Sequence, residues 1–118
     1  MGLPIHDKGF TQEEIDFSFE KYVEGVKVKI ANHYAAKFPT LTPQEIKVKP
    51  GSVYWKLIKY TPGADCGESV YGFVRKVDGA ILKAASWKAP ATNHARGFVT
   101  DSDYGLYCSG PYGIAYLK

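Results

Sequence analysis

Apolar residues recur at three- and four-residue spacing over the first third of the chain. They are Ile15, Phe19, Tyr22, Val23, Val26, Ile30 and Tyr34. This spacing places them on one face of an α-helix. Thr11 and Glu14 form a capping-box pattern at its start, and Pro39 requires the helix to end shortly before it. The sequence therefore predicts a long helix over 11–37 after an N-terminal arm over 1–9, with an apolar face that packs in the core or forms an oligomer seam.

The second part of the chain shows the alternation that is typical of β-strands. Ile46 and Val48 alternate with lysines in a brief strand that ends at Pro50. From residue 53 to residue 60 apolar side chains occupy both faces, which indicates a strand within a sheet. Further strands are predicted over 69–77, 80–87, 97–100 and 114–117.

Asp78-Gly79 lies between two of these runs and predicts a two-residue hairpin turn. If Val77 pairs with Ala80, the register divides the side chains between two faces. One face then carries Tyr71, Phe73, Arg75, Leu82, Ala84 and Ser86. The other face carries Val70, Val74, Lys76, Ile81, Lys83 and Trp87.

These elements give an α+β fold, in which a long N-terminal helix packs on a mainly antiparallel β-sheet of about five strands. The chain has 118 residues, 45% of them hydrophobic and 23% charged. Those values fit a single domain over 1–118, with a β-rich part over 44–118.

Charge and cysteine usage restrict the function classes. The net charge of +3 permits an anionic partner, but no run of Lys or Arg forms a nucleic-acid footprint. Cys66 and Cys108 show no metal-type spacing, and the chain starts without an export-signal pattern. No apolar stretch approaches the roughly 20 residues needed to cross a bilayer. We therefore expect a cytoplasmic protein with reduced thiols and no membrane partner.

Polar and aromatic chemistry is concentrated in the loop over 86–97. Its candidate ligand-binding residues are Ser86, Trp87, Lys88, Asn93, His94 and Arg96, with Arg75 and Lys83 as second-tier candidates on the neighbouring strands. An indole stacks on a base, and cationic side chains neutralise phosphate. Asn93 and His94 would hydrogen-bond the sugar or the base. In the competing interpretation Trp87 is a core residue and the cations are ordinary surface residues.

Other aromatic residues allow two interpretations as well. Tyr54, Tyr71, Phe73, Tyr104, Tyr107, Tyr112 and Tyr116 either build a stacking wall or pack the core of a small domain.

Catalytic and metal-binding patterns are weak in this sequence. His94 has no nucleophile or paired carboxylate in a recognised motif around it. Asp101-x-Asp103-x-Gly105 matches only a fragment of a calcium loop, and the three histidines are widely separated. We therefore expect no cofactor, no metal and no catalysis, with a small phosphodiesterase centred on His94 as the enzymatic alternative.

Four stretches of the C-terminal half form a set: SVYGFV over 69–74, DGAILKAASWKAPA over 78–91, ARG over 95–97 and PYGIAYL over 111–117. Together they resemble a group of small bacteriophage-encoded proteins. Within this group the chain is similar to the first family of anti-Thoeris proteins, which oligomerise and sequester cyclic ADP-ribose-type signals, or in some members cyclic oligonucleotides, without cleaving them. The resemblance implies a ligand pocket at subunit contacts. Phe98 stands where such phage sequences often have Asn, so no binding residue is transferred by position.

The sequence and the resemblance together predict a non-catalytic phage protein that binds and sequesters a nucleotide-derived signalling molecule to block host antiviral defence. Its partner would be an anionic nucleotide-type small molecule in the cytoplasm of the infected bacterial host, and the protein would form a homo-oligomer. One alternative is a phage structural or host-takeover protein that acts through protein–protein contacts. The other is a single-stranded nucleic-acid binder, which the modest charge makes less favourable.

Overall fold

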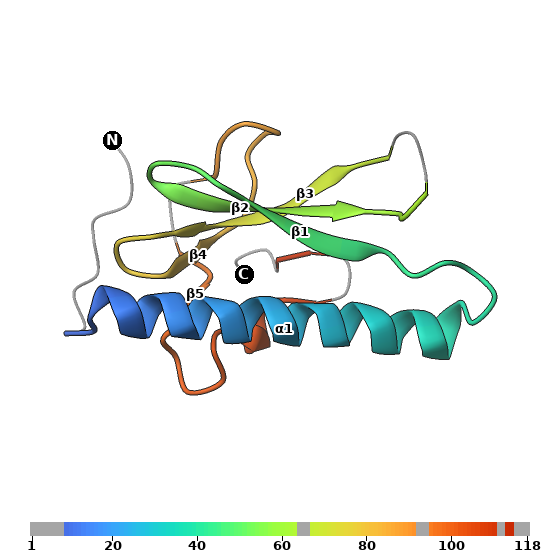
Figure 1. Cartoon of the computed structure of the whole chain (residues 1–118), viewed down its shortest axis with the longest axis horizontal. Coiled ribbons are helices and arrows are strands. Elements are labelled where there is room, and N and C mark those ends of the chain that lie inside the picture. Colours follow the sequence, from blue (N-terminus) through green and yellow to red (C-terminus); the bar gives the residue numbers. More distant parts are fainter. Residues whose placement is uncertain (1–8, 64–66, 92–94, 111–112, 115–118) are drawn as a thin grey trace.

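The fold consists of one long helix and one sheet (Figure 1). The computed structural model describes residues 9–63, 67–91, 95–110 and 113–114. The helix α1 (Gln12–Lys37) lies along one face of a five-stranded antiparallel sheet. The predicted α+β class is therefore confirmed.

The strands follow one another across the sheet in the order of the sequence. They are β1 (Glu45–Pro50), β2 (Tyr54–Tyr60), β3 (Ser69–Arg75), β4 (Ala80–Leu82) and β5 (Gly97–Phe98). Each strand is antiparallel to its neighbour, and the short 3-10 helix η1 (Leu106–Cys108) follows the sheet. The prediction that the second strand lies within the sheet is confirmed, because β2 pairs with both β1 and β3.

The start of α1 has the predicted capping box. The Thr11 hydroxyl accepts a hydrogen bond from the Glu14 N–H at 3.2 Å, and the Glu14 carboxylate accepts one from the Thr11 N–H at 2.9 Å. The buried residues of the helix are Ile15, Phe19, Tyr22, Val23, Val26 and Ile30, and Tyr34 is partly buried. The apolar stripe therefore packs in the core of this chain.

The sheet presents two different faces. The Phe19 ring stacks on the Trp55 ring at a centroid distance of 4.0 Å, so Trp55 and its cross-strand partner Val74 face α1. Lys49, Lys56, Phe73 and Leu82 are successive cross-strand partners of one another. Because side chains alternate between the faces of a strand, this second row lies on the face directed away from α1, called here the outer face.

The β3–β4 hairpin is present, but its register differs from the prediction. Phe73 pairs with Leu82, whereas the predicted register paired it with Ala84. The loop contains four residues, 76–79, and the Gly79 N–H donates to the Arg75 carbonyl at 2.8 Å. Because the register differs by two residues, Phe73 and Leu82 still share one face, as predicted.

A buried ion pair explains the longer loop. The Arg75 guanidinium donates to the two carboxylate oxygens of Asp78 at 3.0 and 2.6 Å, and the Asp78 carboxylate also accepts from the Ala80 N–H at 3.1 Å. The two charged side chains are only 7% and 1% exposed. Arg75 therefore closes the hairpin.

A β-bulge changes the position of Tyr71. Leu57 pairs with Gly72 and Ile58 pairs with Val70, so Tyr71 is the extra residue between these pairs. Tyr71 belongs to the core cluster beneath α1, and its hydroxyl donates to the Gly110 carbonyl at 2.6 Å. The prediction that Tyr71 shares a face with Phe73 was wrong, because the bulge interrupts the alternation.

Strand β4 ends at Leu82, five residues before the predicted end at Trp87. The N–H groups of Ala85 and Ser86 both donate to the Ala89 carbonyl, at 3.0 and 3.1 Å, and the Ala91 N–H donates to the Lys83 carbonyl at 2.7 Å. These bonds fold residues 83–91 into a compact loop, called here the 83–91 loop.

The C-terminal part is described only in places. Gly97–Phe98 forms β5 within the predicted strand 97–100, and Ile114 forms a single bridge with Ser109. Residues 115–117 of the last predicted strand and Cys66 lie outside the described residues. Cys108 is a buried free thiol, and burial raises its pKa.

We predict that Asp78→Ala destabilises the fold by about 3–5 kcal/mol, because it leaves the Arg75 charge buried without its carboxylate. Chemical denaturation followed by circular dichroism measures this loss. Glu68→Ala is the matched control, since it removes the exposed carboxylate that contacts Lys47 and should cost at most about 1 kcal/mol. Equal losses in the two variants would contradict a structural role for the buried pair.

Candidate functional site

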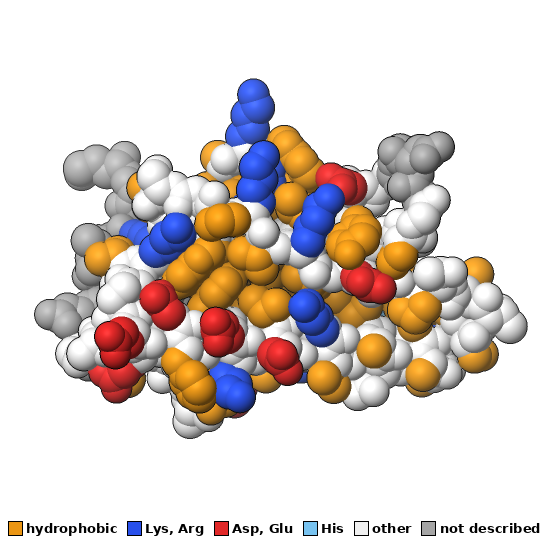
Figure 2. Space-filling view, in the orientation of Figure 1, with side chains coloured by type: hydrophobic (Ala, Val, Ile, Leu, Met, Phe, Trp, Pro, Cys, Tyr) orange, Lys and Arg blue, Asp and Glu red, His pale blue; other side chains and the backbone are white. Residues whose placement is uncertain are grey.

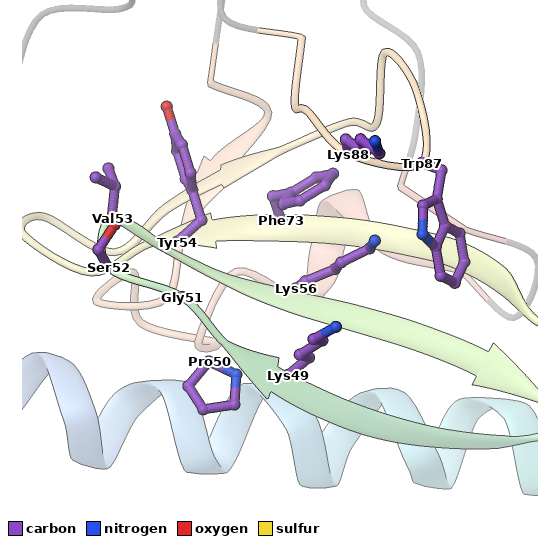
Figure 3. Close-up of a pocket in the computed structure, with 10 residues that line it drawn as sticks. All are labelled: Lys49, Pro50, Gly51, Ser52, Val53, Tyr54, Lys56, Phe73, Trp87 and Lys88. Atoms are coloured by element: carbon purple, nitrogen blue, oxygen red, sulfur yellow. The ribbon is translucent and has the colours of Figure 1, made fainter.

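A pocket of about 530 Å³ opens on the outer face of the sheet (Figure 3). Its floor comes from β2 and β3, and its walls come from the end of β1, the β1–β2 turn and the 83–91 loop. The residues that line it are Lys49, Pro50, Gly51, Ser52, Val53, Tyr54, Lys56, Phe73, Trp87 and Lys88.

Three lysines contribute positive charge to this pocket. Lys49 and Lys56 are direct cross-strand partners, and Lys88 reaches the pocket from the 83–91 loop. Like charges directly opposite each other destabilise a strand pair. None of the described residues that line the pocket is acidic. The lining therefore has an excess of positive charge that a bound anion would neutralise.

The charges of the neighbouring lysines act on Lys56. Desolvation lowers the pKa of Lys56 below its ordinary value of 10.5, and the charges of Lys49 and Lys88 lower it further, whereas Glu68 acts in the opposite direction. The Glu68 carboxylate contacts the ammonium of Lys47, outside the pocket. The charges of Lys49 and Lys88 therefore act on Lys56, and three cations grouped in this way form a site suited to an anion.

Trp87 holds the Lys56 ammonium. The Nζ atom of Lys56 lies 3.6 Å from the centroid of the indole ring, a cation–π contact. Trp87 is 46% exposed and lies across the pocket from Tyr54 (Figure 3). The competing interpretation of Trp87 as a core residue is therefore wrong.

The other end of the pocket is apolar and aromatic. The rings of Tyr54 and Phe73 meet edge to face, with centroids 6.0 Å apart. Val53 extends the same end and is 51% exposed. Figure 3 shows Val53 and Tyr54 at one end of the pocket and Trp87 at the other, with Phe73 between them.

Of the sequence-predicted residues, Trp87 and Lys88 line the pocket, and Ser86 shapes the loop that carries them. The Ser86 hydroxyl accepts from the Lys88 N–H at 3.3 Å. Asn93 and His94 lie outside the described residues.

The remaining predicted cations do not line the pocket. Arg75 is held by Asp78, and the Lys83 ammonium donates to the Ile114 carbonyl at 2.9 Å. Arg96 is half-buried beside β4, where its backbone N–H donates to the Ile81 carbonyl at 2.8 Å.

Sequence reasoning missed the two lysines of the strands. Lys49 alternates with the apolar residues Ile46 and Val48 and is interpreted as solvent-exposed, and Lys56 lies in a stretch whose other residues are mostly apolar. The sequence does contain one indication that Lys56 lies beside an aromatic ring. Tyr54 and Lys56 alternate with Trp55 and Leu57, so Tyr54 and Lys56 share the opposite face of the strand. Only the strand pairing shows that Lys49 and Phe73 complete the row.

Residues 9–110 match a family of unknown function, DUF7717. The chain belongs to this family. The match covers α1, the whole sheet and η1, so every residue that lines the pocket lies within the DUF7717 region. Searches of curated proteins and of solved structures found no match.

Two further observations concern the described residues alone. None of their helices is both long and apolar enough to cross a membrane. Among them there is also no group of three or more His, Cys, Asp or Glu side chains arranged to hold a metal ion.

We predict that Lys49→Gln slows acylation of the Lys56 amine by an amine-reactive ester at pH 9. Removing the neighbouring charge raises the pKa of Lys56, so a smaller fraction of the amine is unprotonated and nucleophilic. Mass spectrometry of proteolytic peptides measures the rate. The control Lys27→Gln removes an exposed charge on α1 and should leave the rate unchanged. An unchanged rate in Lys49→Gln would show that the two lysines do not interact.

Proposed function

We propose that the protein binds an anionic small molecule of the nucleotide type in the outer-face pocket, without turning it over. The observation that carries this proposal is the combination of three ammonium groups with aromatic side chains around one pocket. Cations neutralise phosphate and rings bind the base, which are the two needs of a nucleotide ligand.

The size of the pocket favours a small ligand. Pockets for small molecules usually have volumes of about 300–1,000 Å³, and this open pocket has a volume of about 530 Å³. A site for single-stranded nucleic acid needs a groove that follows several nucleotides of backbone. The charge distribution supports an anion as well, since Figure 2 shows acidic side chains along α1 and basic side chains mainly over the sheet.

The described lining favours binding over chemistry. It contains no His, Asp or Glu, the side chains that most often act as general acids and bases in enzymes. A protein that binds without turnover removes its ligand from solution in proportion to the number of its binding sites. The proposal therefore extends to sequestration of a nucleotide-derived signal by a phage protein in the cytoplasm of an infected bacterium, as the sequence resemblance implies.

Exposed apolar side chains on α1 favour a second candidate function, protein–protein contact. Phe17 and Val28 are 55% and 56% exposed and lie eleven residues apart, which places them on the same side of the helix. This surface suits a protein partner or a second copy of the chain, the homo-oligomer expected from the sequence. It lies on α1, away from the pocket, so both functions are compatible.

We predict that at least one compound from a panel of cyclic ADP-ribose isomers, cyclic dinucleotides, cyclic trinucleotides and ADP raises the melting temperature. Heating the complex should then release the compound chemically intact, as chromatography would show. Lys56→Gln should raise the dissociation constant about tenfold or more, since it removes a charged hydrogen-bond donor. Lys27→Gln is the matched control and should bind normally.

Three other results would contradict the proposal in different ways. A cleaved product would indicate an enzyme. Binding only to single-stranded oligonucleotides, with a steep loss of affinity as salt is added, would indicate a nucleic-acid binder. No shift with any nucleotide or oligonucleotide would leave the apolar surface of α1 as the functional site.

A further inference from the structure

One end of the pocket is cationic and the other end is aromatic. The two ends together determine which class of ligand fits and in which orientation. Resting on the proposed function, we infer that the pocket binds a nucleotide with two or more linked phosphates in one orientation. The phosphates lie among Lys49, Lys56 and Lys88, and the base lies against Tyr54 above Phe73.

The cationic end follows from the directions of the lysine side chains. In Figure 3 Lys49 and Lys56 both extend from the strands toward the Trp87 side of the pocket, and Lys88 lies above them on the loop. The contact of Lys56 with the indole fixes its ammonium at that end. The pKa of Lys56 responds to both other lysines, so the three charges share one region.

The number of charges sets the number of phosphates. A terminal phosphate carries about −1.5 to −2 at pH 7, and a second, linked phosphate adds about one more negative charge. A diphosphate therefore matches the three ammonium groups, whereas a monophosphate leaves positive charge uncompensated. Lysine interacts with phosphate as a point charge and not through bidentate hydrogen bonds. The site therefore depends more on the charge of the ligand than on its shape.

The aromatic end accepts the base. Tyr54 is half-buried at the end of the pocket opposite Trp87, and its ring meets Phe73 edge to face (Figure 3). Phe73 itself is 3% exposed and forms the floor. This contact restricts the ring of Tyr54, which lowers the entropic cost of stacking.

Trp87 has a different role from the stacking role that the sequence suggested. The Lys56 ammonium lies against its indole ring. Trp87 is therefore a positioning residue, which holds Lys56 at the cationic end. When a phosphate binds there, the ammonium moves toward it and the environment of the indole changes.

Isothermal titration calorimetry with ADP, AMP, adenosine and inorganic pyrophosphate tests this inference. We expect ADP to bind about tenfold or more tightly than AMP, and pyrophosphate to bind without a base. Tyr54→Ala should weaken ADP about fivefold or more, and should weaken pyrophosphate much less. Tyr54→Phe, which keeps the ring, should bind ADP normally, and circular dichroism confirms that each variant is folded.

Tryptophan fluorescence tests the role of Trp87 separately. Pyrophosphate should change the emission of the wild-type protein, and Trp87→Phe should abolish the change, because Trp55 is stacked on Phe19 on the opposite face.

Each contrary outcome has its own meaning. Equal affinity for AMP and ADP would overturn the diphosphate requirement and leave the proposed function intact. Equal weakening of ADP and pyrophosphate by Tyr54→Ala would overturn the orientation. An unchanged emission on pyrophosphate binding would overturn the role of Trp87. If ADP and pyrophosphate fail to bind while a panel nucleotide without linked phosphates, such as a cyclic dinucleotide, binds, the inference fails alone, and if no compound of the panel binds, the proposed function fails with it.

Discussion

The contact between α1 and one face of the sheet is the constraint on which the site depends. Phe19 stacks flat on Trp55, and the apolar stripe of the helix continues from Ile15 to Ile30 over the same face. This packing uses the apolar side chains of β2 that point toward α1. The alternating side chains, Tyr54 and Lys56, are thereby directed to the outer face, where none of the helices in the described part of the chain covers them. The burial that stabilises the fold also determines which residues are available for a ligand.

The outer face becomes a pocket because β4 is short. After Leu82 the chain leaves the sheet, and the 83–91 loop carries Trp87 and Lys88 over the lysine row of β1 and β2. Two structural features lie on other residues of β3 and its hairpin. The Arg75–Asp78 ion pair closes the β3–β4 hairpin, and the bulge at Tyr71 ties β3 to the C-terminal segment through the Gly110 carbonyl. Arg75 therefore has a structural role, whereas Lys49, Lys56 and Lys88 line the pocket.

Most of the fold could be predicted from the sequence, because local patterns determine it. The capping box at Thr11, the helical stripe and the position of the β3–β4 hairpin all depend on residues that are close in the chain, whereas the predicted two-residue turn at Asp78-Gly79 proved to be a four-residue loop. The site could be predicted only in part. Trp87 and Lys88 stood out through their crowded loop, whereas Lys49 and Lys56 join them only through the pairing of β1 with β2. Arg75 was assigned to the site because the sequence does not reveal that Asp78 holds it, and Tyr71 was placed on the wrong face because a bulge leaves no signal in the alternation.

The central claim is that a nucleotide binds on the outer face of the sheet, between Tyr54 and the three lysines. The most direct test is a nuclear magnetic resonance titration of the isotopically labelled protein with ADP, in which chemical-shift changes are mapped on the backbone amides. The account predicts chemical-shift changes concentrated at β1, at the first half of β2 and in the 83–91 loop. The amides of α1 and of Ile114 should be unaffected. Changes centred on α1, or around Lys83 and Arg96, would contradict it.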